Sequence, residues 1–337
     1  MSLIPFLHLV AERQDLASAD AQAAMGIILS GESSPTQIAA FLMALRMKGE
    51  TVGELVGFAR AMRQAGRTVR VEGSGPLIDT CGTGGDGGRT FNISTVAAFV
   101  IAGAGVRVAK HGNRSLSSRC GSADLMESLG VKISHDTEEM ARAIREVGIG
   151  FLFAPAIHTA MKHAQPVRAE LKMRTAFNLL GPLTNPAGAT AQLVGAPSEA
   201  AAELIAGALA ELGLQRGFVV HGSDGLDEIT TTGATLAFEV IGGRVERRCL
   251  QPGMFGVSLA SPEDLRGGEV AANRDIAMGV LAGEKGPRRD IVLVNAGAAL
   301  VAAGRAGSFE EGAKLAAESI DTGAARARLQ QLVDFTN

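Results

Sequence analysis

The chain has 337 residues, of which 46% are hydrophobic and 20% charged, and its formal net charge is −3. This length accommodates one large domain or two ordinary ones, and the composition is that of a globular protein with a sizeable core. The slight negative charge, 13 Phe and the lack of Trp and Tyr argue against a nucleic-acid partner, which favours basic surfaces and stacking aromatics.

The cysteines and the apolar segments indicate the cellular compartment of the protein. Cys81, Cys120 and Cys249 are too widely spaced for a metal-binding pair or a disulfide framework, and they suit a reducing cytosol. The N-terminus lacks the basic start and apolar core of a signal peptide. The longest apolar runs are shorter than the roughly 20 residues that span a bilayer. We therefore expect a cytoplasmic protein with no membrane partner.

The first 70 residues predict helices only. Three helical stretches cover 20–29, 38–47 and 52–64, with helix starts at Ser34-Pro35 and at Thr51. From residue 77 onward, short apolar runs alternate with helical stretches, which predicts an α/β sheet domain. The expected strands are 77–80, 107–109, 150–153, 217–221, 236–240 and 244–248. The expected helices are 96–104, 122–129, 137–147, 199–212, 272–282, 287–303, 309–319 and 324–333. We place the boundary between a helical domain (1–70) and an α/β domain (71–337) near residue 70.

The most informative stretch runs from residue 77 to residue 119. After a short strand come five glycines: Gly82, Gly84, Gly85, Gly87 and Gly88. Glycines let backbone N–H groups approach an oxyanion closely, and the following helix start adds unpaired N–H groups, a positive dipole end and two hydroxyl groups. Between the acidic residues at 86 and 124 no acidic residue occurs, whereas five basic residues do. This pattern predicts a site for a ligand with several phosphate charges.

Other interpretations of the glycines are weaker. The spacing Gly82-x-Gly84-x-x-Gly87 matches a dinucleotide fingerprint, but the acidic residue expected about 20 positions later falls in a basic window. The ATP-type loop requires Gly-Lys-Ser/Thr, and this loop ends Gly-Arg-Thr. A flexible turn without a ligand leaves the adjoining helix start and basic loop unexplained.

A second candidate lies after the strand at 217–221, where Asp224, Asp227 and Glu228 fall within five residues. Taken alone, this segment is better explained by a solvated acidic turn than by a metal site. A polyphosphate ligand favours the metal site, since it normally travels with Mg²⁺, which takes oxygen ligands and often one or two carboxylates.

Four segments together resemble the anthranilate phosphoribosyltransferase family: Gly82–Asp86, Asn92–Thr95, Lys110–Arg114 and Asn178–Pro186. The resemblance covers nearly the whole chain. It implies a small helical domain, made discontinuous by a segment returning near 165–190, and a large α/β domain with a mixed, mostly parallel sheet. It also implies Mg²⁺-dependent transfer of phosphoribosyl from phosphoribosyl pyrophosphate (PRPP) to the amine of anthranilate, in tryptophan biosynthesis, by a homodimer that associates through the helical domain.

The resemblance also implies roles for individual residues. Lys110 and His111 are the catalytic candidates, Ser94, Asp227 and Glu228 hold Mg²⁺, and Gly82, Asn113 and Arg168 contact anthranilate. The implied PRPP contacts are Gly82, Thr83, Gly84, Gly85, Asp86, Thr90, Asn92, Ile93, Ser94, Thr95, Lys110, His111, Gly112, Asn113, Arg114, Ser115, Leu116, Ser117, Ser118 and Ser122. One departure from the family pattern is Lys172, where glycine is common.

Two alternatives share the expected architecture. A pyrimidine-type nucleoside phosphorylase would use inorganic phosphate without paired metal carboxylates, so Asp227-Glu228 argues against it. A non-catalytic relative that binds nucleic acid would need a basic surface, which the net charge does not suggest.

Overall fold

The computed structural model describes residues 2–84, 89–115 and 119–337. Within these residues, one sheet has the strand order β3-β2-β1-β4-β5-β6-β7. Neighbouring strands from β3 to β5 are parallel, whereas the pairs β5–β6 and β6–β7 are antiparallel. The strands are β1 (Leu77–Gly82), β2 (Arg107–Gly112), β3 (Ile149–Phe153), β4 (Ala191–Gly195), β5 (Arg216–Gly222), β6 (Thr235–Ile241) and β7 (Arg244–Leu250). The predicted mixed, mostly parallel sheet is confirmed.

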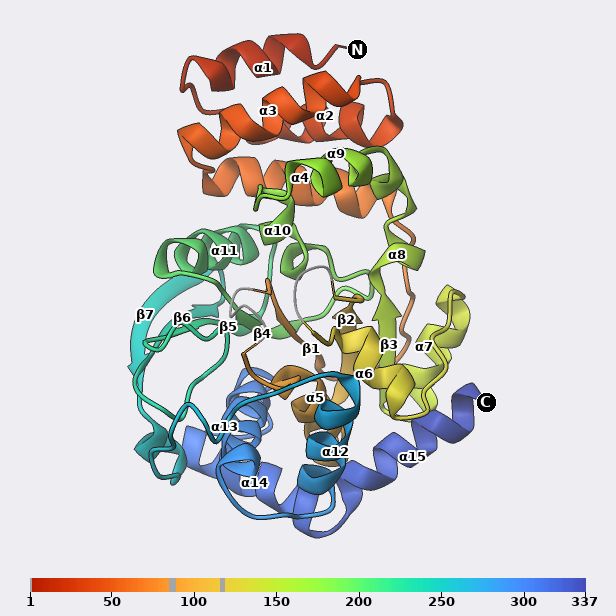
Figure 1. Cartoon of the computed structure of the whole chain (residues 1–337), viewed down its shortest axis with the longest axis vertical. Helices are drawn as coiled ribbons and strands as arrows, with labels where there is room; N and C mark the ends of the chain where they lie inside the picture. The colour runs from red at the N-terminus through yellow and green to blue at the C-terminus, as the bar shows by residue number, and fades with distance from the viewer. Residues whose placement is uncertain (1, 85–88, 116–118) are drawn as a thin grey trace.

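Helices cover both faces of this sheet (Figure 1). On one face, α5 and α13 pack against the strands, and α14 and α15 pack on those helices. On the other face, α11 packs against β5 and β6. The helices of this region are α5 (Ile93–Gly103), α6 (Ser122–Ser128), α7 (Thr137–Glu146), α8 (Ala154–Ile157), α11 (Glu199–Glu211), α12 (Val270–Leu281), α13 (Pro287–Ala302), α14 (Phe309–Asp321) and α15 (Ala324–Thr336), with the 3₁₀ turn η3 (Pro252–Phe255).

The N-terminal helices form a bundle above the sheet, and α4 joins it to α11 (Figure 1). A later segment returns to this bundle, where η1 packs on α2, α9 on α3 and α10 on α4. Val167 and Phe177 of that segment are buried in the same apolar core as the N-terminal helices. The elements are α1 (Ile4–Ala11), α2 (Ser18–Ser30), α3 (Pro35–Lys48), α4 (Val52–Ala65), η1 (Thr159–His163), α9 (Gln165–Leu171), α10 (Phe177–Leu180) and η2 (Pro182–Thr184). This packing supports the discontinuous helical domain, while its boundary near residue 70 remains our proposal.

Predicted helix starts are borne out by hydrogen bonds. The hydroxyl of Ser34 accepts from the N–H of Gln37 at 3.3 Å. Thr51 and Glu54 form a capping box, in which each side chain accepts from the other residue's N–H. Such caps satisfy backbone donors that the helix itself leaves unpaired.

Several elements were not predicted. The strand β4 is buried along its whole length and contains Gln192 and a terminal glycine, so it shows no alternation of apolar and polar residues. The helix α1 was also missed, as were η1 and α9 in the segment that returns to the helical bundle. Lys172 ends α9 in the left-handed conformation, with φ of 49°. This conformation explains why glycine suits that position.

In the ranges that the structure describes, no helix combines the length and the apolar character that crossing a membrane requires.

Candidate active site

The site lies where the order of the strands in the sheet reverses. From β1 the order runs through β2 to β3 on one side and through β4 to β5 on the other. At such a reversal, the loops that follow the two neighbouring parallel strands lead away from each other. Ligands of these sheets usually bind in the crevice between the two loops. At this crevice, Gly82 is paired with Gly195, and the N–H of Thr83 donates to the carbonyl oxygen of Gly195 at 3.0 Å.

The glycine loop, which follows β1 and starts at Gly82, leaves room for the acidic turn between β5 and β6. The acidic turn carries Asp224, Asp227 and Glu228. A Cβ atom at Gly82 would lie 2.7 Å from Oδ2 of Asp227, and one at Gly195 would lie 1.6 Å from its carbonyl oxygen. Gly84 has φ of 67°, which side chains disfavour. Glycine is therefore required for close packing of the turn against the loop. Gly85 and Asp86 lie outside the described residues.

Two carboxylates of the acidic turn form hydrogen bonds outside it, and one forms them within it. Asp227 accepts from the N–H of Gly84 at 3.1 Å, and Glu228 accepts from the N–H of Ser94, in the first turn of α5, at 3.2 Å. Asp224 instead faces its own turn, where it accepts from the hydroxyl of Thr230 at 2.6 Å. Asp227 and Glu228 thus reach the predicted phosphate-binding elements, and Asp224 braces the turn that carries them.

The donor set around these two carboxylates suits magnesium. The hydroxyl of Ser94 lies 3.5 Å from the ammonium of Lys110 and belongs to the residue whose N–H meets Glu228. No group of three or more His, Cys, Asp or Glu side chains in the described residues is arranged to hold a metal ion. Two carboxylates and a hydroxyl leave coordination places for phosphate oxygens and water, which is how Mg²⁺ is commonly held. A closed structural zinc site would need nitrogen or sulfur ligands.

Lys110 lies within β2 as a buried cation, with 1% of its surface exposed. Its ammonium donates to the carbonyl oxygen of Thr80 at 2.6 Å. Burial lowers the pKa of Lys110, and the carboxylates of Asp79 and Glu228 partly oppose that shift. Burial likewise raises the pKa of Asp79, which accepts from the backbone of His111 at 3.1 Å and from the carboxamide of Asn185 at 2.8 Å. Opposite charges thus lie together beneath the crevice.

The start of α5 supplies the predicted hydroxyl and N–H groups. Ile93 is buried, and the carbonyl oxygen of Ser94 accepts from Thr80 at 3.0 Å, which fixes the helix start on β1. The Thr95 hydroxyl is buried and has no hydrogen bond within the described residues. Asn92 faces elsewhere, because its carboxamide donates to the carbonyl oxygen of Cys120 at 3.0 Å.

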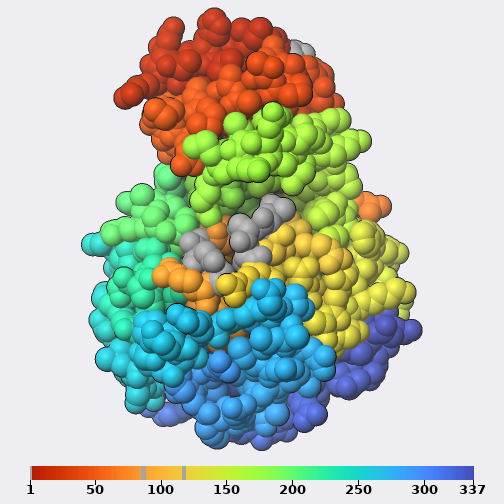
Figure 2. Space-filling model, in the orientation of Figure 1, coloured from red at the N-terminus to blue at the C-terminus, as the bar shows by residue number. Residues whose placement is uncertain are grey.

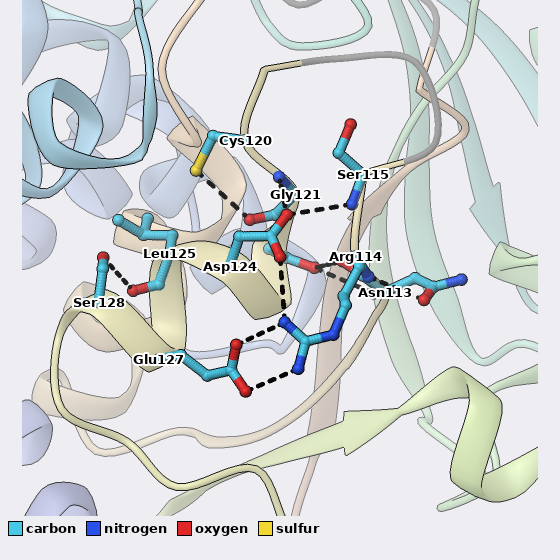
Figure 3. Close-up of polar contacts among 10 residues, drawn as sticks. Asn113, Arg114, Ser115, Cys120, Gly121, Asp124, Leu125, Glu127 and Ser128 are labelled. Carbon is cyan, nitrogen blue, oxygen red and sulfur yellow. Dashed lines mark hydrogen bonds and ion pairs between the residues drawn. The ribbon is translucent and has the colours of Figure 1, made fainter.

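The loop after β2 is held by α6, as Figure 3 shows. The guanidinium of Arg114 bonds both oxygens of Glu127, at 2.5 and 2.7 Å, and one oxygen of Asp124 at 3.2 Å. Asp124 also accepts from the N–H groups of Ser115 and Gly121. Arg114 therefore faces carboxylates in this structure, not the glycine loop.

Other predicted residues of this loop have separate positions. The Ser122 hydroxyl lies 3.2 Å from the N–H of Asn113, which follows Gly112 at the end of β2. The side chain of Asn113 extends away from the α6 carboxylates (Figure 3). The loop residues Leu116, Ser117 and Ser118 lie outside the described residues.

His111 is a buried, neutral histidine. Burial lowers its pKa to about 3, and the neighbouring ring of His158, 5.2 Å away between centroids, adds to the effect. Its Nδ1 lies 3.3 Å from the carbonyl oxygen of Gly181, so Nδ1 carries the proton. Its buried Nε2 makes no hydrogen bond in the part of the chain that the structure describes. The lone pair of Nε2 is then available to an N–H donor.

The returning helical segment closes the site from above. Its surface, lime green in Figure 2, lies between the N-terminal helices and the α/β domain. Arg168 stacks over Phe177 at 5.3 Å, and burial lowers its pKa. Arg174 reaches the glycine loop, where it donates to the carbonyl oxygens of Thr83, at 3.1 Å, and Gly84. Its own carbonyl oxygen accepts from Arg46 of α3.

A cavity of about 400 Å³ adjoins the two loops. Its lining includes Thr90 and three arginines, Arg89, Arg119 and Arg266, together with Asp224. Thr90 also forms an isolated β-bridge with Arg266. The cavity extends the crevice toward the loop that precedes α12.

Two family models match the chain. The helical bundle domain of a glycosyl transferase family matches residues 4–66, and its a/b domain matches residues 74–326. The anthranilate phosphoribosyltransferase of Solibacter usitatus is 68% identical over 337 residues, which cover 99% of each chain. The chain belongs to the anthranilate phosphoribosyltransferase family.

Solved members of this family share the fold over nearly their whole length. The anthranilate phosphoribosyltransferase of Thermus thermophilus is 45% identical, with a TM-score of 0.93 over 98% of each chain. The enzyme of Saccharomyces cerevisiae, in complex with PRPP and Mg, is 28% identical, with a TM-score of 0.91 over 99% of this chain and 97% of that one.

Three residues at the anthranilate phosphoribosyltransferase site were missed from the sequence. Arg174 has no predicted role, Asp79 falls within the expected strand 77–80, and Asn185 falls within the family motif Asn178–Pro186. Each acts through partners at least 32 residues away in the sequence, at Gly84, His111 and Asp79 respectively. A charged residue inside a buried strand is the one signal that could have singled out Asp79, since such groups are rarely buried without a partner.

Proposed function

We propose that this chain is an anthranilate phosphoribosyltransferase, which transfers the phosphoribosyl group of PRPP to the amine of anthranilate. The observation that carries the proposal is the meeting of Asp227 and Glu228 with the N–H groups of Gly84 and Ser94. Carboxylates suited to a divalent cation and N–H groups suited to phosphate thereby face one place. That place is where a magnesium–pyrophosphate group has to lie.

We propose Mg²⁺ as the cofactor, held by Asp227, Glu228 and the Ser94 hydroxyl, as the PRPP and Mg complex of the yeast relative suggests. Once bound, the ion would neutralise charge on the pyrophosphate. In the reaction, the bond from C1 of the ribose to the pyrophosphate oxygen breaks, and its electron pair leaves with pyrophosphate. Lys110 and the fixed N–H groups at the start of α5 stabilise this developing negative charge.

The acceptor lies on the side of the crevice that faces the helical segment. We assign the carboxylate of anthranilate to Arg168, whose planar guanidinium can bond both oxygens, and an additional contact to Asn113. The amine attacks C1, forms the C1–N bond and then releases a proton to solvent. With a pKa of about 3, His111 is too weak a base to remove that proton near neutral pH. Its unprotonated Nε2 can accept an N–H bond and orient the amine.

An assay of anthranilate fluorescence tests this proposal. Purified protein should consume anthranilate only when both PRPP and Mg²⁺ are present, and one equivalent of pyrophosphate should appear per anthranilate lost. Reactions that omit each component serve as controls. Folded protein that binds PRPP without consuming anthranilate would contradict the acceptor assignment, and folded protein that binds no PRPP would contradict the reaction class.

We also propose a cytosolic homodimer that associates through the helical bundle. Large apolar side chains are exposed on this region, with Ile4 exposed to 44%, Met47 to 71% and Met173 to 47%. Met47→Glu should lower the sedimentation coefficient to that of a monomer. A monomeric unsubstituted protein at micromolar concentration would contradict the proposal.

A further inference from the structure

A buried carboxamide lies behind the acidic turn. Asn295 is on α13, and none of its surface is exposed. Its neighbours Val294 and Ala296 are equally buried. The surrounding core is apolar, so an unpaired carboxamide would be costly there.

The carboxamide of Asn295 is fully used. Its Oδ1 accepts from the N–H of Ile229 at 2.9 Å, and its Nδ2 donates to the carbonyl oxygen of Ile229, also at 2.9 Å. Nδ2 also donates to the carbonyl oxygen of Ile291, one helical turn earlier, at 2.9 Å. Asn295 thus ties both polar groups of one backbone residue to a rigid helix, and that residue directly follows Glu228.

The opposite half of the turn is braced separately. Asp224 accepts from the N–H of Leu226 at 3.1 Å and from the hydroxyl of Thr230, whose own N–H donates to Thr235 at 3.0 Å. These bonds join residues of the β5–β6 connection to one another and to Thr235, the first residue of β6. Only Asn295 connects the Asp227–Glu228 pair to α13 among the hydrogen bonds described for the turn.

We infer that Asn295 is a positioning residue for the metal-binding carboxylates. By holding the backbone of Ile229, it fixes where Asp227 and Glu228 lie relative to Gly84 and Ser94. This inference rests on the proposed function. Residues that orient metal ligands without touching the metal typically change metal affinity or activity about 10- to 100-fold when replaced. An apolar side chain of the same size would fill the core but leave both backbone groups of Ile229 unpaired.

Two variants test the role. Asn295→Leu keeps the volume and removes the three hydrogen bonds, whereas Asn295→Ala leaves space in which water can replace them. The matched control is Ser319→Ala on α14, because the buried hydroxyl of Ser319 donates to the carbonyl oxygen of Val100 at 2.7 Å, away from the acidic turn. Circular dichroism and thermal melting establish that each variant is folded.

Metal binding is measured directly, with Mn²⁺ as the probe. In the presence of PRPP, the free Mn²⁺ signal in electron paramagnetic resonance gives the dissociation constant without any turnover. We expect it to rise about tenfold or more in Asn295→Leu, to rise less in Asn295→Ala, and to stay unchanged in Ser319→Ala. In turnover, the Mg²⁺ concentration for half-maximal rate should rise in parallel, while kcat at saturating Mg²⁺ changes less.

The two arms separate this inference from the proposed function. Mn²⁺ binding equal in all folded variants would overturn the role of Asn295, as would the absence of Mn²⁺ binding to the unsubstituted protein. Failure of the unsubstituted protein to consume anthranilate would count against the proposed reaction alone. A loss of kcat with unchanged Mn²⁺ affinity would show that Asn295 has only a structural role, and it would also overturn the inference.

Discussion

The loops after β1 and β2 leave neighbouring parallel strands, and both were expected to bind the phosphate groups of PRPP. They are held in place by different means. The loop after β1 is held by residues far away in the sequence: Asp227 accepts from the N–H of Gly84, and Arg174 donates to its carbonyl oxygen. The loop after β2 is held by the helix that directly follows it, through Asp124 and Glu127.

The first loop is thus stabilised by long-range contacts and the second by local ones. The first loop takes its shape from the acidic turn and from the helical segment, so its geometry depends on how those two parts come together. The second loop is built locally, and its Arg114 charge is already paired with carboxylates. We therefore expect changes around the first loop to affect PRPP and Mg²⁺ most, and changes around the second loop to affect local stability more than turnover.

The largest effect should come from the acidic turn. Replacing Asp227 by Asn together with Glu228 by Gln removes the carboxylates that face Gly84 and Ser94. We expect kcat/KM to fall about a thousandfold, since charge stabilisation at the leaving group is commonly the largest catalytic contribution. The anthranilate fluorescence assay measures it. A matched control neutralises two exposed carboxylates of α11, Glu203→Gln with Glu211→Gln, and a similar loss there would point to net charge instead.

Arg174 comes next. Arg174→Ala removes two hydrogen bonds from a guanidinium to the glycine loop, worth about 2 kcal/mol, or roughly thirtyfold in affinity. We expect this loss to appear in the KM for PRPP more than in the KM for anthranilate. Arg174→Lys should recover part of it, and Arg142→Ala, on the surface of α7, is the control. An unchanged KM for PRPP would show that the glycine loop keeps its shape without the helical segment.

A smaller effect is expected at the second loop. Asp124→Asn weakens the bonds from Ser115, Gly121 and Arg114, and should cost about 1 kcal/mol of stability with only a severalfold rise in the KM for PRPP. Partial burial raises the pKa of Asp124, but the N–H groups of Gly121 and Ser115 outweigh burial and hold it below its usual value.

A carboxyl with a lowered pKa stabilises the folded state above its unfolded pKa, near 3.8, and loses that contribution as the pH falls through its folded pKa. The stability difference between the unsubstituted protein and Asp124→Asn should therefore shrink below about pH 4. Urea unfolding from pH 3 to pH 6 measures it. A difference that grows on acidification would contradict the assignment.

The smallest effect concerns Lys172, which ends α9 two residues before Arg174. Its φ of 49° costs a side chain about 1 kcal/mol relative to glycine. Lys172→Gly should raise the free energy of unfolding by a few tenths of a kcal/mol up to that value, with little change in kcat. Lys162→Gly, in the returning segment, is the control and should not stabilise. Lower stability of Lys172→Gly would show that the lysine side chain contributes more than the backbone strain costs.

The same division explains what could be predicted from the sequence. The glycine run, the helix start at Ser94 and the basic loop from Lys110 are contiguous patterns with a local physical meaning, so they could be recognised. The α/β sheet domain followed from the alternation of strands and helices. In each case, neighbours in the sequence are also neighbours in space.

The remaining features depend on long-range contacts. β4 lies at the centre of the sheet but carries no alternating pattern, and Gln192 gives no sign that it donates to the carbonyl oxygen of Pro182 at 2.9 Å. Nothing around Asn295 indicates a partner 66 residues away. Residue type and spacing alone do not distinguish Asp224 from Asp227, whereas the fold shows that Asp224 accepts from Thr230 within the turn and Asp227 reaches Gly84.

The most direct test of this account is calorimetric titration of PRPP with and without Mg²⁺. The unsubstituted protein and the Asp227→Asn, Glu228→Gln variant are compared side by side. We expect Mg²⁺ to tighten PRPP binding to the unsubstituted protein at least tenfold, about 1.4 kcal/mol, and to have no such effect on the variant. Equal tightening in both proteins would contradict the assignment of these carboxylates to the metal, and with it the role given to the first loop.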